Sequence, residues 1–230
     1  MGSYLYQRGR NRLLFGPVSG LCTVISILPF NFFRGYILGG HKDATMVNVI
    51  EVLNFSNESS AAITATLDAA KELDGMGVNS SVKGYILGGH TDATMVNVIE
   101  DLNFSSESSA AITATLDAAK YSGAGVNSSA KGYILGGVIA GYSVTAVIED
   151  LNFSNESSAA ITATLDAAKE LDGAGVNSSV KGYILGGHTA APMLSVIEDL
   201  NFSNETSAAI AATLDTAKRA GAGVQSGGIL

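Results

Sequence analysis

The chain has 230 residues, a formal net charge of −8, 47% hydrophobic residues, 27 glycines and 3 prolines. This composition supplies enough apolar material for a core and enough glycine for many turns. The acidic balance, with no cluster of Lys and Arg in residues 34–226, excludes nucleic acid as an expected partner. Cys22 is the single cysteine, which excludes a disulfide within the chain.

Residues 1–33 differ from the rest of the chain and allow two interpretations. Arginines between residues 8 and 12 precede a weakly polar run over residues 13–33, as in a signal peptide or membrane anchor. Prolines and polar residues interrupt this run, and residues 23–32 loosely resemble the apolar run at residues 95–104, so the extension can instead supply extra strands. A membrane is therefore a partner only if residues 1–33 act as an anchor.

The hexapeptide Gly-Tyr-Ile-Leu-Gly-Gly occurs four times and heads four near-identical units that span residues 34–226. Its copies occupy residues 35–40, 84–89, 132–137 and 182–187, so their starts lie 49, 48 and 50 residues apart. A period of about 49 residues indicates an array in which each unit buries a face against its neighbour. We therefore expect one repeat domain over residues 34–230.

Each unit alternates short apolar runs with polar loops. In the second unit, these runs cover residues 84–89, 95–104, 110–116 and 124–129. Residues alternate between apolar and polar in the third run, and Val, Ile and Phe are frequent in the second, as expected of strands. Four short strands per unit predict an all-β fold, a β-propeller of four blades, or of five if residues 1–33 add a blade.

One segment of the unit also carries helix signals. Residues 108–120 and 158–171 each combine a serine that can cap a helix with many alanines and a later glycine. A helix there would make the unit a βα repeat and the array an α/β solenoid. The β-branched Ile112, Thr113 and Thr115 favour a strand, so the solenoid is the alternative to the propeller.

Further segments recur in every unit besides Gly-Tyr-x-x-Gly-Gly. They are Val-Ile-Glu-x-Leu-Asn-Phe-Ser, as at residues 98–105, then Thr-Leu-x-x-Ala-Lys and Gly-x-Gly-Val. Together these segments resemble the kelch-like propeller blades of bacterial and bacteriophage proteins, and the resemblance covers residues 34–226. It implies a ring of four-stranded blades. The chain has no tryptophan, and lysines stand where kelch repeats usually have arginine, so the substrate-binding functions of that family do not carry over.

The array starts at the Gly-Tyr strand and ends, at residues 223–226, with the small strand that elsewhere precedes Gly-Tyr. This offset predicts that the last strand pairs beside residues 35–40 and closes the ring without exposed edges. Because the units are nearly identical, two chains can also share a larger ring, and a homo-oligomer or filament is a further expectation.

Functional residues of a repeat array are expected at equivalent positions of several units, and two such sets are candidates for a ligand-binding ring of loops. The first set follows the double glycine and comprises His41, Asp43, His90, Asp92 and His188, with Val138 in the third unit. The second set comprises Lys71, Lys120, Lys169 and Lys218. Histidine is a common metal ligand, but one unit lacks it and no acid accompanies all three, so we predict no metal and no cofactor.

Single acids and aromatic residues also recur in every unit. The acids within the apolar strand are Glu51, Glu100, Glu149 and Glu198, and we expect them to accept hydrogen bonds from turns or to pair with lysines. Asp68 precedes Lys71 by three residues, and equivalent pairs in the other units suggest exposed ion pairs. The tyrosines of the hexapeptide and the phenylalanines of Asn-Phe-Ser are expected in the core between units. Asn-x-Ser/Thr segments are glycan acceptors in a secreted eukaryotic protein, or otherwise polar turns.

These observations predict a non-enzymatic recognition or assembly module, outside the cell or on a virion or cell surface. Its expected partner is a glycan or another protein, held by loops of several blades. The alternative is a structural subunit of an extracellular fibre or of a phage or cell-surface appendage. No residue set indicates catalysis.

Overall fold

The computed structural model describes residues 34–43, 45–72, 76–92, 94–172, 175–189, 192–219, 221 and 223–224. Contacts divide the chain into a unit over Met1–Phe32 and a second unit over Phe33–Leu230, and all the described strands belong to the second. The strand and anchor hypotheses for residues 1–33 fall outside the described residues. No helix in the described ranges is long and apolar enough to cross a membrane.

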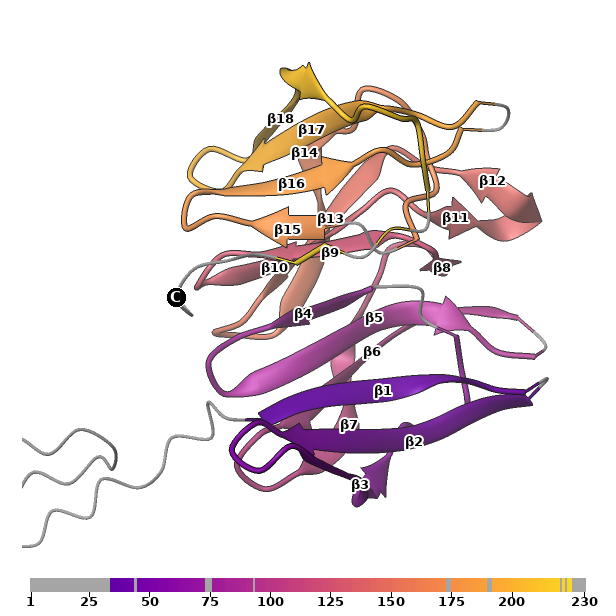
Figure 1. Cartoon of the computed structure of the whole chain (residues 1–230), viewed down its shortest axis with the longest axis vertical. Helices are drawn as coiled ribbons and strands as arrows, with labels where there is room; N and C mark the ends of the chain where they lie inside the picture. The colour runs from indigo at the N-terminus through magenta and orange to yellow at the C-terminus, as the bar shows by residue number, and fades with distance from the viewer. Residues whose placement is uncertain are drawn as a thin grey trace, which may run out of the picture. The chain divides into compact units, whose positions relative to one another are not determined.

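Each Gly-Tyr strand forms an antiparallel sheet with the two long strands that follow it and, in three of the four sheets, with the small strand that ends the preceding repeat (Figure 1). The first sheet holds β1 (Arg34–Lys42), β2 (Thr45–Asn54) and β3 (Ser59–Thr66). The second holds β4 (Gly77–Asn79), β5 (Lys83–His90), β6 (Met95–Asn103) and β7 (Ser108–Thr115). The third holds β9 (Ala124–Asn127), β10 (Lys131–Leu135), β13 (Val147–Asn152) and β14 (Ser157–Thr164). The fourth holds β15 (Gly175–Asn177), β16 (Lys181–Leu185), β17 (Val196–Asn201) and β18 (Thr206–Thr213).

A fifth, small sheet joins β8 (Lys120–Tyr121), β11 (Val138–Ile139) and β12 (Ser143–Val144), with the short 3-10 helix η1 (Ala140–Tyr142) between the last two. Among the described residues, every sheet is antiparallel and none closes on itself. The all-β prediction is therefore confirmed.

The segment with helix signals is a strand. β7 pairs with β6 in the register Glu100 to Ala111 and Asn103 to Ser108, and β14 pairs with β13 in the same way. The β-branched residues and the alternating exposure along β7 suit a strand at the outer edge of a sheet. The α/β solenoid alternative is therefore unsupported.

The pairing of the Gly-Tyr strand β5 with β6 shifts register at the double glycine. Gly88 and Gly89 have φ angles of 74° and 119°, which residues with a Cβ rarely adopt. A Cβ on Gly88 would lie 2.6 Å from the carbonyl oxygen of Lys120, where the end of the repeat crosses the strand. The glycines thus serve close packing and turning, as the sequence predicts.

Successive sheets pack face to face in chain order, from indigo to yellow in Figure 1. In one core cluster, Tyr85 and Leu116 of the second sheet pack with Ile134 and Leu151 of the third. The small strands also lie against one another, since β9 contacts both β4 and β15. This side-by-side packing of small strands brings the backbones of consecutive sheets into direct contact.

The first sheet has three strands where the next three have four, because nothing in the described residues pairs with β1 on the side that β4 occupies beside β5. At the other end of the chain, Gly223 lies against Gly175 as Gly175 lies against Gly125. The described C-terminal residues form no strand with β1, and residues 225–230 lie outside the described part. Ring closure by this segment stays a prediction.

Candidate functional site: the contacts between neighbouring sheets

A buried ion pair joins each sheet to the next. Lys120 of the second repeat pairs with Glu149 of the third, and each side chain is 1% exposed. Lys71 with Glu100, and Lys169 with Glu198, form the same pair at the other two interfaces. The second carboxylate oxygen of Glu149 accepts a hydrogen bond of 2.7 Å from the backbone N–H of Asp117. The prediction that these glutamates pair with lysines and accept hydrogen bonds from turns is therefore confirmed for Glu100, Glu149 and Glu198, whereas Glu51 is exposed and has no lysine partner among the described residues.

The lysine partner differs from the one expected within each loop. The sequence suggested exposed pairs such as Asp68 with Lys71, whereas Lys71 reaches across the interface to Glu100, and Asp68 offers only its backbone N–H to that same carboxylate. The reason is burial: a carboxylate inside the interface gains more from a lysine than an exposed aspartate does. Three of the four lysines of the predicted ligand ring therefore face the core between sheets, and only Lys218 is exposed.

A second polar cluster lies near the hairpin turns of each interface. Between the second and third sheets, Lys83 Nζ lies 2.6 Å from Glu156 and 2.5 Å from Asp101. The Tyr85 hydroxyl donates to the same Glu156 oxygen over 3.1 Å, and the Tyr85 ring stacks on Phe153 with centroids 5.5 Å apart. One glutamate of the next sheet thus accepts hydrogen bonds from both the tyrosine and the lysine of the preceding sheet.

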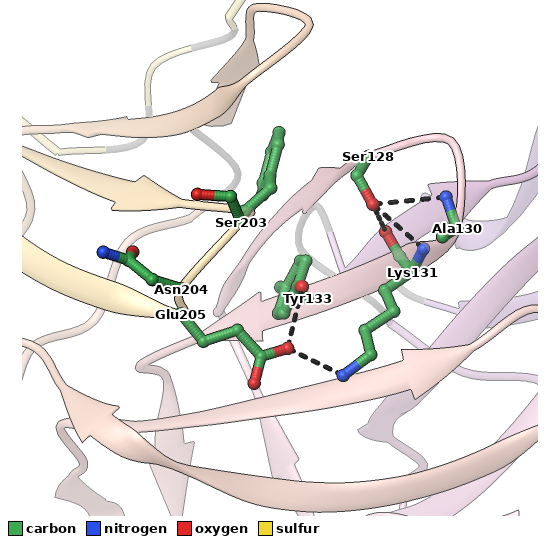
Figure 2. Close-up of a pocket in the computed structure, with 8 residues that line it drawn as sticks. Ser128, Ala130, Lys131, Tyr133, Ser203, Asn204 and Glu205 are labelled. Carbon is green, nitrogen blue, oxygen red and sulfur yellow. Dashed lines mark hydrogen bonds and ion pairs between the residues drawn. The ribbon is translucent and has the colours of Figure 1, made fainter.

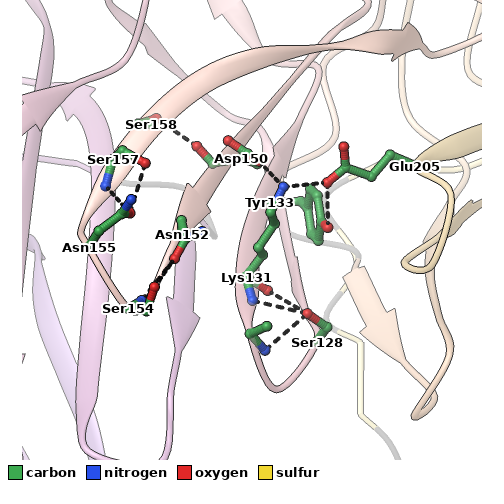
Figure 3. A network of polar contacts seen from close by, with 11 residues as sticks. Ser128, Lys131, Tyr133, Asp150, Asn152, Ser154, Asn155, Ser157, Ser158 and Glu205 are labelled. Atoms are coloured by element: carbon green, nitrogen blue, oxygen red, sulfur yellow. Dashed lines mark hydrogen bonds and ion pairs between the residues drawn. The ribbon is translucent and has the colours of Figure 1, made fainter.

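The same cluster recurs at the flanking interfaces. Lys131 lies 2.7 Å from Glu205 and 2.6 Å from Asp150, and Tyr133 donates to Glu205 over 3.0 Å (Figure 3). At the first interface an arginine takes the lysine position, and Arg34 and Tyr36 both bond Glu107. The expectation that the repeated tyrosines and phenylalanines form the core between units is confirmed by the stacked pairs at all three interfaces.

The cluster shifts the pKa of its members. Hydrogen bonding from Lys83, and then from Tyr85, holds the pKa of Glu156 below its ordinary value of 4.5. Burial, together with the bond to Glu156, raises the pKa of Tyr85 to about 12. Bonds to Asp101 and Glu156 raise the pKa of Lys83. The pKa of Glu156, Lys83 and Tyr85 is therefore shifted, in each case, toward the charge state that binds the neighbouring group.

Backbone geometry explains why the glutamate is in reach. Glu107, Glu156 and Glu205 have φ angles of 51°, 53° and 52°, in the left-handed region, within the turn that joins the second and third long strands. Asn152 supports this turn by accepting hydrogen bonds from the backbone N–H and the hydroxyl of Ser154 (Figure 3). The Asn-Phe-Ser segment thus forms the turn that places the glutamate within reach of the preceding sheet.

A polar hollow of about 420 Å³ opens beside the third of these clusters (Figure 2). Two turns of neighbouring sheets form it: one brings Ser128 and Lys131, and the other brings Ser203, Asn204 and Glu205. Hydroxyl, amide, ammonium and carboxylate groups therefore meet in one place, with aromatic rings of Tyr133 and Phe202 in the lining. Such a set of donors and acceptors beside aromatic rings suits a polar ligand with several hydroxyl groups.

The residues after the double glycine connect repeats through the backbone. His90 exchanges two hydrogen bonds with Glu72, of 2.8 and 2.9 Å, and His188 pairs with Glu170 in the same way. Val138 pairs with Tyr121, so the third repeat keeps the backbone contact without a histidine. The backbone link explains why this position tolerates valine.

The histidine side chains have separate partners. His41 Nδ1 lies 3.5 Å from Glu72, His188 Nδ1 lies 3.8 Å from Glu170, and the His90 ring lies 5.4 Å from the Tyr121 ring. Asp43 and Asp92 are exposed in their loops. Among the residues that the structure describes, no three His, Cys, Asp or Glu side chains form a group that could hold a metal ion. Ligand binding by this loop set stays a prediction.

Sequence reasoning missed the cluster around the turn glutamate. Its signal was present, because a basic residue precedes every Gly-Tyr and a glutamate follows every Asn-Phe-Ser. The turn glutamate lies 71 to 74 residues along the chain from the basic residue and the tyrosine that bond it, so only the packing of consecutive sheets shows that they meet.

The fold and these contacts define an all-β protein of similar, successively packed sheets. Comparison with protein-family models and with curated proteins gives no match to this chain.

Proposed function

We propose that the chain is a non-enzymatic recognition module whose sheets are kelch-like propeller blades. The contacts of the small strands β4, β9 and β15, and those of the outer strands β3, β7, β14 and β18, support this arrangement, since propeller blades pack face to face around small inner strands. The repeated lysines, glutamates and tyrosines bond one sheet to the next. The exposed polar turns are left to face a partner.

The observation that carries this proposal is the polar hollow between neighbouring turns. Its groups offer hydrogen bonds of both kinds, and Lys131, neutralised by two carboxylates, gives it no excess positive charge. A glycan is the partner that this chemistry fits best, with a polar protein loop as the other class. Such a module belongs outside the cell or on a virion or cell surface.

A glycan array, with hits measured by calorimetry, tests the proposal. We expect binding that Asn204→Ala weakens, because Asn204 lines the hollow. Asn57→Ala is the matched control, since Asn57 makes the same turn bonds to Ser59 that Asn204 makes to Thr206, but in the first sheet. Silence across diverse sugars would sink the glycan assignment and leave a protein partner.

A second function, a structural subunit of an extracellular fibre or appendage, has a separate observation in its favour. Glu51 is exposed on the first sheet and Lys218 on the last, whereas their equivalents at the described interfaces are buried in ion pairs. The two end sheets therefore carry the halves of an interface that the molecule itself builds three times.

A further inference from the structure

Each sheet has two different faces, and every described interface joins one of each. The forward face of a sheet carries the tyrosine of the hexapeptide, with the lysine of Ala-Lys beside it from the segment that follows the sheet, as Tyr85 of the second sheet and Lys120 of β8 show. The backward face carries the phenylalanine and two glutamates, as Phe153, Glu149 and Glu156 do in the third. The repeat therefore encodes a head-to-tail contact, not a symmetric one.

The backward face of the first sheet is uncovered in the described structure. Ile37 is 69% exposed and Phe55 is 54% exposed, although Ile86, Ile134 and Ile184 at the position of Ile37 are buried. Glu51 and Glu58 are exposed as well, and neither forms an ion pair with any described residue. This face thus combines exposed apolar side chains with two unpaired carboxylates.

The forward face of the fourth sheet is uncovered in a complementary way. Lys218 is exposed, whereas Lys71, Lys120 and Lys169 are buried. Lys181 bonds Asp199 of its own sheet but has no glutamate from a following sheet among the described residues. Tyr183 has no stacked phenylalanine from a following sheet among the described residues, whereas Tyr36, Tyr85 and Tyr133 each stack on one. The forward face of the fourth sheet therefore carries two ammonium groups and an aromatic ring. The backward face of the first sheet carries the matching carboxylates and Phe55.

The small strand shows the same offset. Gly223 packs on Gly175 and Val176 as the first strand residue of a further sheet would, although the described residues form no further sheet there. The first sheet has the opposite defect, because β1 lacks, among the described residues, the small strand that β5, β10 and β16 each have. Val224, which corresponds to the buried Val126, is 91% exposed.

We propose that a second copy of this chain docks head to tail, its first sheet packing on the fourth sheet of the preceding copy. Lys218 then pairs with Glu51, Lys181 and Tyr183 bond Glu58, and Tyr183 stacks on Phe55. Gly223 and Val224 then lie where β1 lacks its small strand. A contact of this kind between unlike faces can continue from copy to copy, giving a ring or an open filament.

The inference rests on the second proposed function and names its partner, and it is independent of ligand binding in the polar hollow. A second copy is the occupant because both the charges and the apolar side chains of the two end faces complement one another. Charge complementarity also disfavours other pairings, since two forward faces or two backward faces would bring like charges together.

Sedimentation velocity and light scattering at several concentrations, on the full chain, test the proposal through exposed residues. Wild type is expected to form species larger than one chain. Lys218→Glu and Glu51→Lys, each placing like charges in the contact, are expected to weaken association at least about tenfold. The double variant with both changes restores opposite charges and is expected to recover most of the lost association. Lys42→Glu, an equal charge change at the exposed end of β1, is the control and should leave association unchanged.

The outcomes separate the possible failures. A wild-type chain that stays monomeric at every concentration, because it closes on itself or is capped by its own residues 1–33, overturns both the inference and the fibre function. Association that neither single reversal weakens, or that the double variant fails to recover, overturns the inference and leaves the fibre function standing with another contact. Circular dichroism of each variant confirms that the sheets remain folded.

Discussion

Lys120 and Glu149, from consecutive repeats, form an ion pair in which both side chains are buried between two sheets. A charge that is removed from water needs its partner. Without the partner, the cost of desolvating the charge is no longer offset. Because the same pair occurs at each described interface, each repeat needs its lysine in order to pack against the next repeat. This relationship, more than any exposed loop, is the repeated chemical feature of the chain.

The first prediction concerns that pair. We expect Lys120→Met to reduce the free energy of unfolding by about 3–5 kcal/mol, because Glu149 is left as an unpaired buried charge. The matched change Lys218→Met should cost less than about 1 kcal/mol at low protein concentration, since Lys218 is exposed. Urea denaturation measures both, and adding Glu149→Leu to Lys120→Met should recover much of the loss. Equal costs at residues 120 and 218 would contradict the structure.

The second prediction concerns a close approach of two backbones. A Cβ on Gly125 would overlap the carbonyl oxygen of Gly77 in the preceding small strand, whereas a Cβ on Gly77 would meet nothing nearer than the Tyr85 carbonyl oxygen at 3.8 Å. We expect Gly125→Ala to destabilise the fold by about 2 kcal/mol or more and Gly77→Ala to be nearly neutral. Thermal unfolding compares the two, and a costly Gly77→Ala in a monomeric sample would show that a strand covers it.

The third prediction concerns stability in acid. The pKa of Glu156 is lowered in the folded state, so its contribution to stability is complete above its ordinary pKa of 4.5 and is lost as the pH falls through the lowered value. We expect Glu156→Gln to reduce stability at pH 7 and to flatten its decline below pH 4.5. Glu58→Gln, at the uncovered equivalent, should change neither. The readout is the midpoint of urea unfolding between pH 7 and acid.

The fourth prediction concerns stability in alkali. Burial raises the pKa of Tyr85 from 10.0 to about 12, so the neutral phenol contributes stability that is present below pH 10 and lost toward pH 12. Ultraviolet titration at the phenolate absorption should show late-ionising tyrosines, and Tyr85→Phe should remove one of them. Loss of an early-ionising group in Tyr85→Phe would argue against the buried cluster.

The sequence predicted more of the fold than of the site. Repetition, alternation and the β-branched Ile112 and Thr113 indicated strands, and the glycine pairs indicated turns, because these signals depend on neighbouring residues alone. The same local view paired Lys71 with Asp68, the nearest acid along the chain. It did not show that Glu100 of the next repeat is nearer in space.

What the sequence by itself determined is the unit: its strands, its turns and the residues that every copy must place at an interface. The tertiary structure decided which lysine meets which glutamate, which tyrosine meets which phenylalanine, and which copies of each are left without a partner among the described residues. The physical reason is that a repeat specifies its own strands through local geometry, but burial arises only when one face packs on another. Glu51 and Glu149 have similar sequence surroundings, and only the presence of a preceding sheet buries one and leaves the other exposed.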